Sequence, residues 1–144
     1  MLSETLKKFG YPKTLIKKYE NWLLLCRPKQ VTLGSLILIC KEEVDAFFKI
    51  SEVGFYELPK IIKEIETKTK DLFQYDKINY LMLMMHDPEV HFHIIPRYSG
   101  EKTFANATFK DFGWPRMPGF DRVNEVESSV MKKLIEQLQK SFAC

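Results

Sequence analysis

The chain is 144 residues long, with 45% hydrophobic residues, 28% charged residues and a formal net charge of +3. These values indicate one globular domain, residues 1–144, with a hydrophobic core, and they argue against a disordered chain. The longest apolar run, residues 31–40, is too short to cross a bilayer, and the charged start of the chain lacks the apolar stretch of a signal peptide. We therefore expect a cytoplasmic protein without membrane contact.

The positive charge is mild and scattered along the chain. It suits an anionic substrate, but no dense basic stripe is interleaved with aromatic residues, so nucleic acid is not an expected partner. The cysteines, Cys26, Cys40 and Cys144, are widely spaced and form no Cys-x-x-Cys pair of the kind found in zinc or redox sites. We expect them to be buried hydrophobic residues in a reducing compartment.

The first third of the chain predicts two strands. Residues 15–19 are ambiguous between a strand and a helical turn, whereas the apolar residues 22–26 predict a buried strand. A turn follows at Pro28, which has no amide hydrogen to donate to a ladder. Residues 31–40 predict a second strand, in which Gly34 indicates a bulge or the close approach of a backbone or ligand.

Helices and a hairpin are predicted further along. Apolar positions in residues 51–73 recur at helical spacing, with Ser51 as the capping residue; Pro59 either kinks this helix or lies in the first turn of a helix that begins near it. Residues 78–85 are apolar on both faces and predict a central strand. A tight connection then leads to a strand over residues 90–98, which gives an antiparallel hairpin.

The last part of the chain predicts a long loop and a helix. Residues 99–120 are rich in glycine and proline, which favours a loop, and Asp121 is a suitable cap for a final helix. Sequential antiparallel strands flanked by helices predict an α+β domain. The buried side of the final helix is expected to contain Val123, Val126, Val130, Leu134 and Leu138.

The strand over residues 90–98 contains the residues best suited to chemistry. Because side chains two apart in a strand share a face, Glu89, His91 and His93 lie on one face and the apolar residues between them lie on the other. An imidazole can attack phosphorus, donate hydrogen bonds to phosphate oxygens or bind a metal. The alternative is an exposed strand face on which both histidines are simply hydrated.

The run His91-Phe-His-Ile-Ile-Pro-Arg97 resembles the signature of the histidine triad (HIT) family, in which His-x-His-x-His precedes two apolar residues and often Pro-Arg. Residues 30–38 resemble the family's glycine-histidine strand, and residues 77–80 resemble the strand before the motif in a short-loop bacterial branch. The resemblance covers residues 15–98. It implies an antiparallel sheet of about five strands packed with helices, plus a C-terminal helix, in a homodimer.

The resemblance also implies an activity. HIT proteins hydrolyse or transfer nucleoside monophosphates at the α-phosphate, so the chain is expected to be a phosphoric-ester or anhydride hydrolase or a nucleotidyltransferase. Its substrate would be a nucleotide or a related phosphorylated small molecule, such as a dinucleoside polyphosphate or a phosphoramidate. His91 corresponds to the nucleophile that forms a nucleotidyl intermediate, and His93 to the residue that holds the phosphate. This chemistry requires no metal and no cofactor.

The sequence departs from the family pattern at three places. Glu89 replaces the first triad histidine; its carboxylate can accept a hydrogen bond from His93 and fix its tautomer, but it also repels phosphate. Ser35 stands where many members have histidine. Met84-Met85 stands where the bacterial branch has Gly-Asn and uses an amide near the phosphate, so an oxyanion donor is lost.

Four further residues are candidates for substrate binding. Gln30 and Ser35 are candidates because they lie before and after Gly34 in the sequence. Arg97 can hold a phosphate oxygen or pair with Glu89, or simply be a surface arginine; His86 can donate to a leaving group, or be a hydrated turn residue. Two other functions remain open. One is a nucleotide-binding or interaction module of the same fold with weak catalysis; the other is a metalloenzyme using Glu89 and the two strand histidines, with or without His86.

Overall fold

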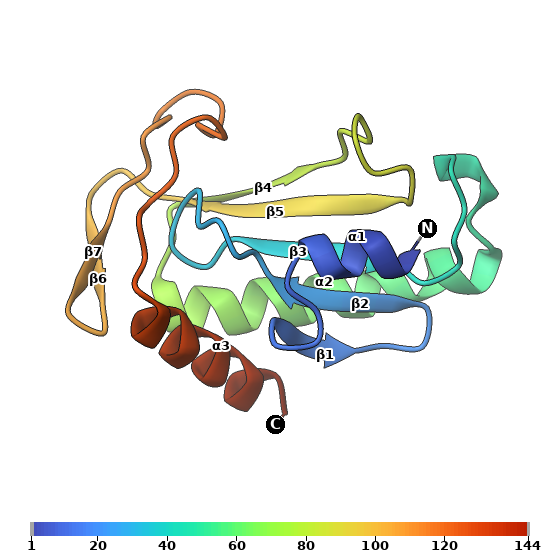
Figure 1. Ribbon diagram of the computed structural model, residues 1–144, viewed down its shortest axis with the longest axis horizontal. Coiled ribbons are helices and arrows are strands. Elements are labelled where there is room, and N and C mark those ends of the chain that lie inside the picture. Colours follow the sequence, from blue (N-terminus) through green and yellow to red (C-terminus); the bar gives the residue numbers. More distant parts are fainter. Residues whose placement is uncertain (1, 144) are drawn as a thin grey trace.

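A computed structural model describes residues 2–143. Its centre is an antiparallel sheet of five strands in the order β1-β2-β3-β5-β4 (Figure 1). The strands are β1 (Leu15–Lys18), β2 (Trp22–Cys26), β3 (Leu36–Cys40), β4 (Lys77–Leu81) and β5 (His91–Arg97). With the helices that cover it, this sheet confirms the predicted α+β fold, and the antiparallel pairing of β4 with β5 confirms the predicted hairpin.

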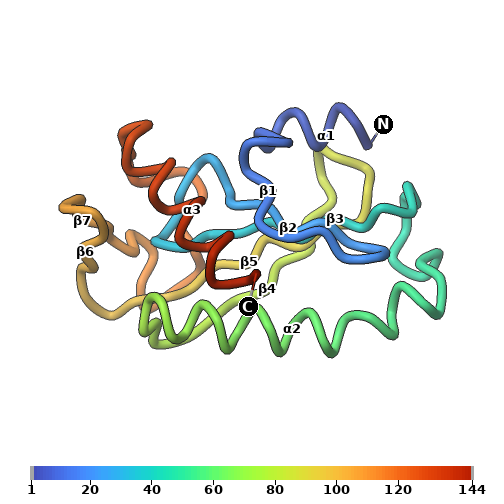
Figure 2. Tube along the Cα trace, turned by 90° about the horizontal axis from the view of Figure 1, so that it is seen from below, coloured from blue at the N-terminus to red at the C-terminus, as the bar shows by residue number. Residues whose placement is uncertain are grey.

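Helices cover the two faces of the sheet unequally (Figure 2). Ile61 and Leu134, from two long helices, pack in the main core on one face, whereas Leu6 and Phe9 at the N-terminus pack against the other. No helix within residues 2–143 is long and apolar enough to cross a membrane. The helices are α1 (Leu2–Lys8), α2 (Glu52–Phe73) and α3 (Ser128–Ala143), with a 3₁₀ turn, η1 (Phe47–Lys49).

Helix α2 begins and ends at residues that satisfy its free backbone groups. The Ser51 hydroxyl accepts a hydrogen bond from the amide of Gly54 at 3.0 Å, which confirms the predicted cap. Gln74 ends the helix in the left-handed conformation, with φ of 48°. Pro59 lies inside the helix rather than in its first turn. The indole of Trp22 donates to the Gly54 carbonyl at 2.9 Å, which ties β2 to the start of α2.

The strand predicted over residues 31–40 is too long, because β3 begins only at Leu36. The preceding residues form a turn in which Oε1 of Gln30 accepts hydrogen bonds from the amides of Gly34, at 2.9 Å, and Ser35, at 3.1 Å. Gly34 has φ of +84°, a conformation that favours glycine and does not occur within a strand. Gly34 therefore marks a turn and not a bulge.

The prediction of a central strand over residues 78–85 is also wrong. β4 ends at Leu81 and lies at the edge of the sheet. Met84, with a left-handed φ of 51°, belongs to the loop that returns to β5. Ile78 and Tyr80 are only partly buried against the main core, as is usual at a sheet edge. Residues 78–85 are therefore apolar for two reasons: the side chains of β4 contact the main core, and the loop that follows β4 is itself apolar.

The loop predicted over residues 99–120 contains a two-stranded hairpin. Its strands are β6 (Lys102–Phe104) and β7 (Ala107–Phe109). Ala105 and Asn106 connect them with φ of 49° and 65°, the turn geometry that matches the twist of a two-residue hairpin. The hairpin was missed because alanine gives no signal for such a turn.

The final helix begins at Ser128 rather than after Asp121. The Asn124 side chain holds the preceding segment out of a helix: its Nδ2 donates to the carbonyls of Gln30, at 3.1 Å, and Lys110, at 2.9 Å. The predicted buried positions are confirmed for Val130, Leu134 and Leu138, whereas Val123 and Val126 precede the helix.

Two of the three cysteines are buried with free thiols, as predicted. Burial raises the pKa of the Cys26 thiol to about 12 and also raises that of Cys40, so neither is a reactive thiolate at neutral pH. Cys144 lies outside the described residues.

Candidate functional site

Strand β5 presents its two histidines to the face of the sheet that α1 covers. His91 pairs with Ile39 and His93 pairs with Ile37, both of which belong to the apolar cluster around α1. The exposed fractions of the two histidines are only 3% and 8%. Alternation along the strand is therefore confirmed, and burial rules out the alternative in which the imidazoles are simply hydrated.

A backbone hydrogen bond sets the tautomer of His91. Its Nδ1 lies 2.7 Å from the carbonyl oxygen of Glu89. Because a carbonyl oxygen only accepts, Nδ1 must carry the hydrogen and donate it, which leaves the lone pair of the neutral ring on Nε2. The ring centroid of His91 lies 5.1 Å from that of His93, with the planes at 73°. The pair thus offers one nucleophilic nitrogen beside a second imidazole.

His93 is held between two aromatic rings. The ring centroids of Phe120 and Phe9 lie 5.5 Å and 6.4 Å from that of His93. Burial, with smaller contributions from the neighbouring His91 and Arg27, lowers the pKa of His93 from 6.5 to about 4. His93 is therefore neutral at physiological pH. Its Nδ1 is buried and has no hydrogen-bond partner within residues 2–143.

Glu89 has a different partner from the one expected. No hydrogen bond joins its carboxylate to His93 within the described part of the chain; instead, Oε1 of Glu89 accepts a hydrogen bond from the hydroxyl of Thr5 in α1. Next to it, Nζ of Lys8 lies 2.9 Å from the carboxylate of Asp87. These two contacts attach α1 to the segment that enters β5. These contacts could not be predicted from local sequence, because Thr5 and Glu89 are 84 positions apart.

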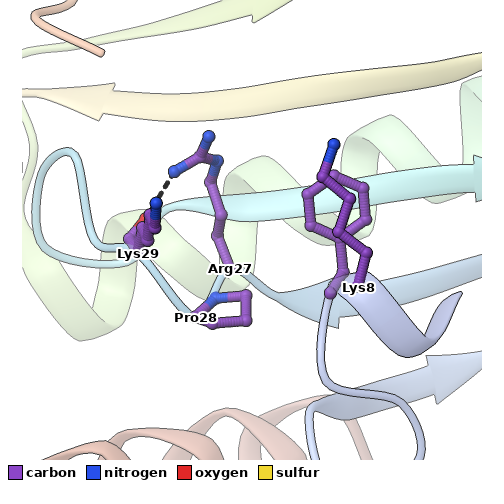
Figure 3. A pocket seen from close by; sticks show the side chains of 5 residues that line it. Lys8, Arg27, Pro28 and Lys29 are labelled. Atoms are coloured by element: carbon purple, nitrogen blue, oxygen red, sulfur yellow. Dashed lines mark hydrogen bonds between the residues drawn. The ribbon is translucent and has the colours of Figure 1, made fainter. Parts of the chain in front are cut away.

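Positive side chains line a pocket formed by the end of α1 and the turn after β2 (Figure 3). It has a volume of about 230 Å³ and is lined by Lys8, Phe9, Arg27, Pro28 and Lys29. The Phe9 ring borders both the pocket and the imidazoles. Among residues 2–143, no acidic side chain lines this pocket.

Arg27 lies at the centre of this group. Its Nη1 donates to the carbonyl of Lys29 at 2.7 Å, and its guanidinium lies 5.4 Å from the centroid of the Phe120 ring. Its Nε is buried and has no hydrogen-bond partner among residues 2–143. Burial lowers the pKa of Arg27, although an arginine keeps its charge at neutral pH. Arg27 was predicted only as part of the turn at Pro28, so its role in this group was missed.

The remaining candidates lie away from the two histidines or face other partners. Gln30 and Ser35 are fully buried, and their polar atoms form hydrogen bonds inside the turn before β3. Arg97 does not pair with Glu89, because these residues stand at opposite ends of β5; it forms a bidentate pair with Asp111 at 2.7 Å and 3.1 Å. His86 is exposed in the loop between β4 and β5.

The residues proposed for the metalloenzyme alternative do not converge. Within residues 2–143, no group of three histidine, cysteine, aspartate or glutamate side chains is placed to hold a metal ion. The Glu89 carboxylate, one of the three proposed ligands, is hydrogen-bonded to the Thr5 hydroxyl.

No protein-family model matches the sequence, and no curated protein matches it either. Solved structures do match the fold. A histidine triad protein from Marinobacter aquaeolei is 18% identical with a TM-score of 0.77, and the match covers 99% of this chain and 96% of that one. One from Bradyrhizobium japonicum is 20% identical with a TM-score of 0.74, covering 96% and 94%.

A third similar structure is a hypothetical histidine triad nucleotide-binding protein from Sulfolobus tokodaii. It is 20% identical with a TM-score of 0.66, and the match covers 90% of this chain and 83% of that chain. The fold of this protein is therefore that of the histidine triad proteins, as residues 91–97 predicted.

Proposed function

We propose that this protein is a nucleotide hydrolase or nucleotidyltransferase that acts at the α-phosphate of a nucleoside phosphate through a nucleotidyl-His91 intermediate. One observation carries the proposal: the hydrogen bond from Nδ1 of His91 to the Glu89 carbonyl leaves a lone pair on Nε2, beside a neutral imidazole and a cationic pocket. The histidine triad fold and the nucleotide-binding description of the Sulfolobus protein support it.

The proposed reaction has two steps. In the first, Nε2 of His91 forms a bond to the α-phosphorus while the bond from phosphorus to the leaving oxygen or nitrogen breaks. The leaving group keeps that electron pair, and a leaving amine also takes a proton from solvent. In the second, a water oxygen or another acceptor attacks the phosphorus and loses its proton to solvent. The N–P bond then breaks, and its electron pair returns to Nε2. The Glu89 carbonyl keeps the His91 ring oriented throughout and stabilises the cationic ring of the intermediate.

His93 is proposed to hold the phosphate as a neutral donor. Its low pKa keeps it uncharged, and its Nδ1 has no competing hydrogen-bond partner in the described residues. Because both imidazoles are buried beneath Phe9, the α-phosphate reaches His91 only after this ring or α1 shifts. Glu89 is proposed as a positioning residue, because its carbonyl orients His91 while its carboxylate binds Thr5 of α1.

Binding roles also remain proposed for four residues. Gln30 and Ser35 shape the turn next to the site, and Arg97 holds the far end of β5. His86, which is exposed in the loop before β5, is proposed as a donor to the leaving group. No metal or cofactor is included in this proposal.

Turnover of nucleoside phosphoramidates and dinucleoside polyphosphates, with and without His91→Ala, tests the proposed function. The protein is expected to release nucleoside monophosphate from at least one member of such a panel, and His91→Ala is expected to abolish the release. Lys133→Ala, an exposed change on α3, is the matched control and should keep full activity. Release that persists in His91→Ala, or a complete lack of turnover by the unchanged protein, contradicts the proposal.

The second candidate is a nucleotide-binding module without rapid turnover. It is favoured by the buried Glu89 carboxylate near the site and by Met85, whose side chain is 82% exposed where the bacterial branch has an asparagine. Nucleotide binding by calorimetry without any product release identifies this function. Turnover that depends on His91 excludes it.

We also propose that two copies of the chain form a homodimer. β4 is an edge strand, and the loop after it exposes apolar Leu83 and Met85. The unpaired backbone groups of an edge strand can pair with another chain, and apolar residues beside that edge favour such a contact. Sedimentation equilibrium should give twice the mass of the chain; a single-chain mass across the micromolar range contradicts the dimer.

A further inference from the structure

Helix α1 lies on the sheet with few attachments of its own. It has seven residues, fewer than the roughly 12–15 that an isolated helix needs to persist in water. Outside the helix, and within residues 2–143, its backbone groups bond only to residues 9–11 and, at its exposed start, to the carboxylate of Glu43. Leu6 and Phe9 are the buried apolar side chains that anchor this segment to the sheet. A segment held in this way opens at a lower free energy than the whole fold.

Two side-chain contacts attach α1 to residues 87–89, directly before β5. The hydroxyl of Thr5 donates to the carboxylate of Glu89, and the exposed fractions of the two residues are only 3% and 5%. A hydrogen bond to a charged group is roughly twice as strong as a neutral one. Lys8 and Asp87 form the second contact, at 2.9 Å, but the Lys8 side chain is 52% exposed, so this ion pair contributes less. The contact of Thr5 with Glu89 is therefore the stronger attachment.

In this position, α1 and Phe9 close the site around the two strand histidines. The centroid of the Phe9 ring lies 6.2 Å from that of His91 and 6.4 Å from that of His93. Both imidazoles are buried, whereas His86, the third histidine of the chain, is exposed. Closure also leaves Nδ1 of His93 buried without a hydrogen-bond partner among residues 2–143, which costs free energy. Contacts elsewhere in α1 must offset this cost.

We propose that residues 2–9 form a lid that keeps the histidine site closed until a substrate displaces it, and that the hydrogen bond from Thr5 to Glu89 is its latch. Glu89 stands where the HIT pattern has its first histidine, and its carboxylate binds α1 rather than His93. The proposal rests on the proposed function and deepens it by naming what regulates access to His91. A substrate that binds only the open form has its apparent affinity reduced by the open fraction.

Diethyl pyrocarbonate, which acylates accessible neutral imidazoles, tests the lid without any substrate. Peptide fragmentation in a mass spectrometer gives the modification rate of each of the three histidines. In the unchanged protein, His91 and His93 are expected to react much more slowly than His86. Thr5→Val keeps the shape of the side chain and removes the latch. It is expected to accelerate the modification of His91 and His93 about 10-fold or more, as for the loss of one hydrogen bond to a charged group, and to leave His86 unaffected.

Thr67→Val is the matched control, because it makes the same change at an exposed site on α2, where the hydroxyl donates to the Lys63 carbonyl at 2.8 Å. It should leave all three rates unaffected. Thr5→Ser keeps the donor and should keep both buried histidines protected. Unchanged rates in Thr5→Val, or an equal acceleration in Thr5→Ser, overturn the latch.

A second variant keeps the test valid if Thr5→Val does not fold. Lys8→Gln breaks the exposed contact with Asp87, and it is expected to accelerate the modification of His91 and His93 about two- to fivefold. Lys7→Gln, an exposed change on the same helix, should leave the rates unaffected. Equal rates in these two variants overturn the lid.

Turnover separates this proposal from the proposed function. For a substrate that the unchanged protein turns over, Thr5→Val is expected to raise kcat/KM about 10-fold, because more molecules are open. Faster modification together with a lower kcat/KM overturns the inhibitory role of α1. Faster modification without turnover by either protein supports the lid and refutes the proposed function. Turnover that depends on His91, with modification rates that Thr5→Val does not change, refutes the lid and leaves the proposed function standing.

Discussion

The two ends of β5 place polar side chains on the same face of the sheet in very different surroundings. At the C-terminal end, the buried guanidinium of Arg97 is satisfied by both carboxylate oxygens of Asp111 and by Asn79, at 2.8 Å. At the N-terminal end, Nδ1 of His93 has no partner among the described residues, and neither does Nε of the neighbouring Arg27. One end is complete within the chain, and the other has free hydrogen-bonding capacity.

The difference between the two ends distinguishes buried polar residues that stabilise the fold from buried polar residues that are available to bind a ligand. A saturated network such as that around Arg97 stabilises the fold, and removing one member leaves a buried charge. An unsaturated group such as that around His93 costs stability, and binding offsets this cost when a ligand supplies the missing partners. Substitutions at the two ends should therefore separate activity from stability.

The largest expected effect is at the unsaturated end. His91→Asn removes the nucleophile and is expected to lower kcat by about 10⁴-fold or more. The free energy of unfolding should change by less than about 1 kcal/mol, because asparagine can keep a hydrogen bond to the Glu89 carbonyl. Steady-state kinetics and urea unfolding of the same preparation measure both. If His91→Asn instead loses much stability and keeps some activity, the N-terminal end of β5 has a structural role, which contradicts the account.

The next effect is at the saturated end. Asp111→Ala leaves Arg97 buried without its carboxylate, and about 3–5 kcal/mol of stability is expected to be lost. The control is Asp45→Ala, which breaks an exposed pair with Lys49 and should cost less than about 1 kcal/mol. Urea unfolding followed by circular dichroism compares them. Similar losses for the two variants contradict a structural role for the Arg97 network.

A smaller loss of stability is expected in the turn that packs against the saturated end. A Cβ at Gly34 would lie 2.7 Å from Cε2 of Phe73, and its φ of +84° disfavours alanine. Gly34→Ala is expected to lose about 2–4 kcal/mol. Gly100→Ala is the control, because no atom lies within 4 Å of the added Cβ. If thermal unfolding gives equal midpoints for both variants, the turn is less constrained than its geometry indicates.

The smallest expected effect is the dependence of folding stability on pH, which comes from His93 at the unsaturated end. The pKa of His93 is about 4 in the folded protein, below the 6.5 of a free imidazole. The unfolded chain therefore binds a proton first as pH falls. Stability from the neutral ring is present above pH 6.5 and is lost progressively as pH falls towards 4. His93→Asn should show a flatter decline in urea unfolding. An NMR titration of His93 with a midpoint near 6.5 contradicts this account.

Sequence reasoning succeeded where local pattern decides structure. The buried strand at Trp22–Cys26 and the helix capped by Ser51 were predicted because apolar periodicity and capping depend on neighbouring residues. The placement of His91 and His93 on one face follows from the two-residue repeat of a strand in the same way.

It failed where structure depends on residues far apart in the chain. Nothing local indicates that Thr5 binds Glu89 or that Phe120 packs on His93, and Arg27 was read only as part of a turn. The edge position of β4 was missed because an apolar strand with one core-facing side resembles a central strand in sequence. These features require the docking of α1 and of the segment before α3, which arises only on folding.

The covalent intermediate on His91 provides the most direct test of the account. The protein is mixed with diadenosine tetraphosphate and denatured under alkaline conditions within the first turnover. It is then digested, and the mass of the peptide that contains His91 is measured by mass spectrometry. The account predicts an added nucleoside monophosphate on His91 that is absent from His91→Asn. Turnover without an adduct on that peptide, or an adduct on a different residue, would contradict it.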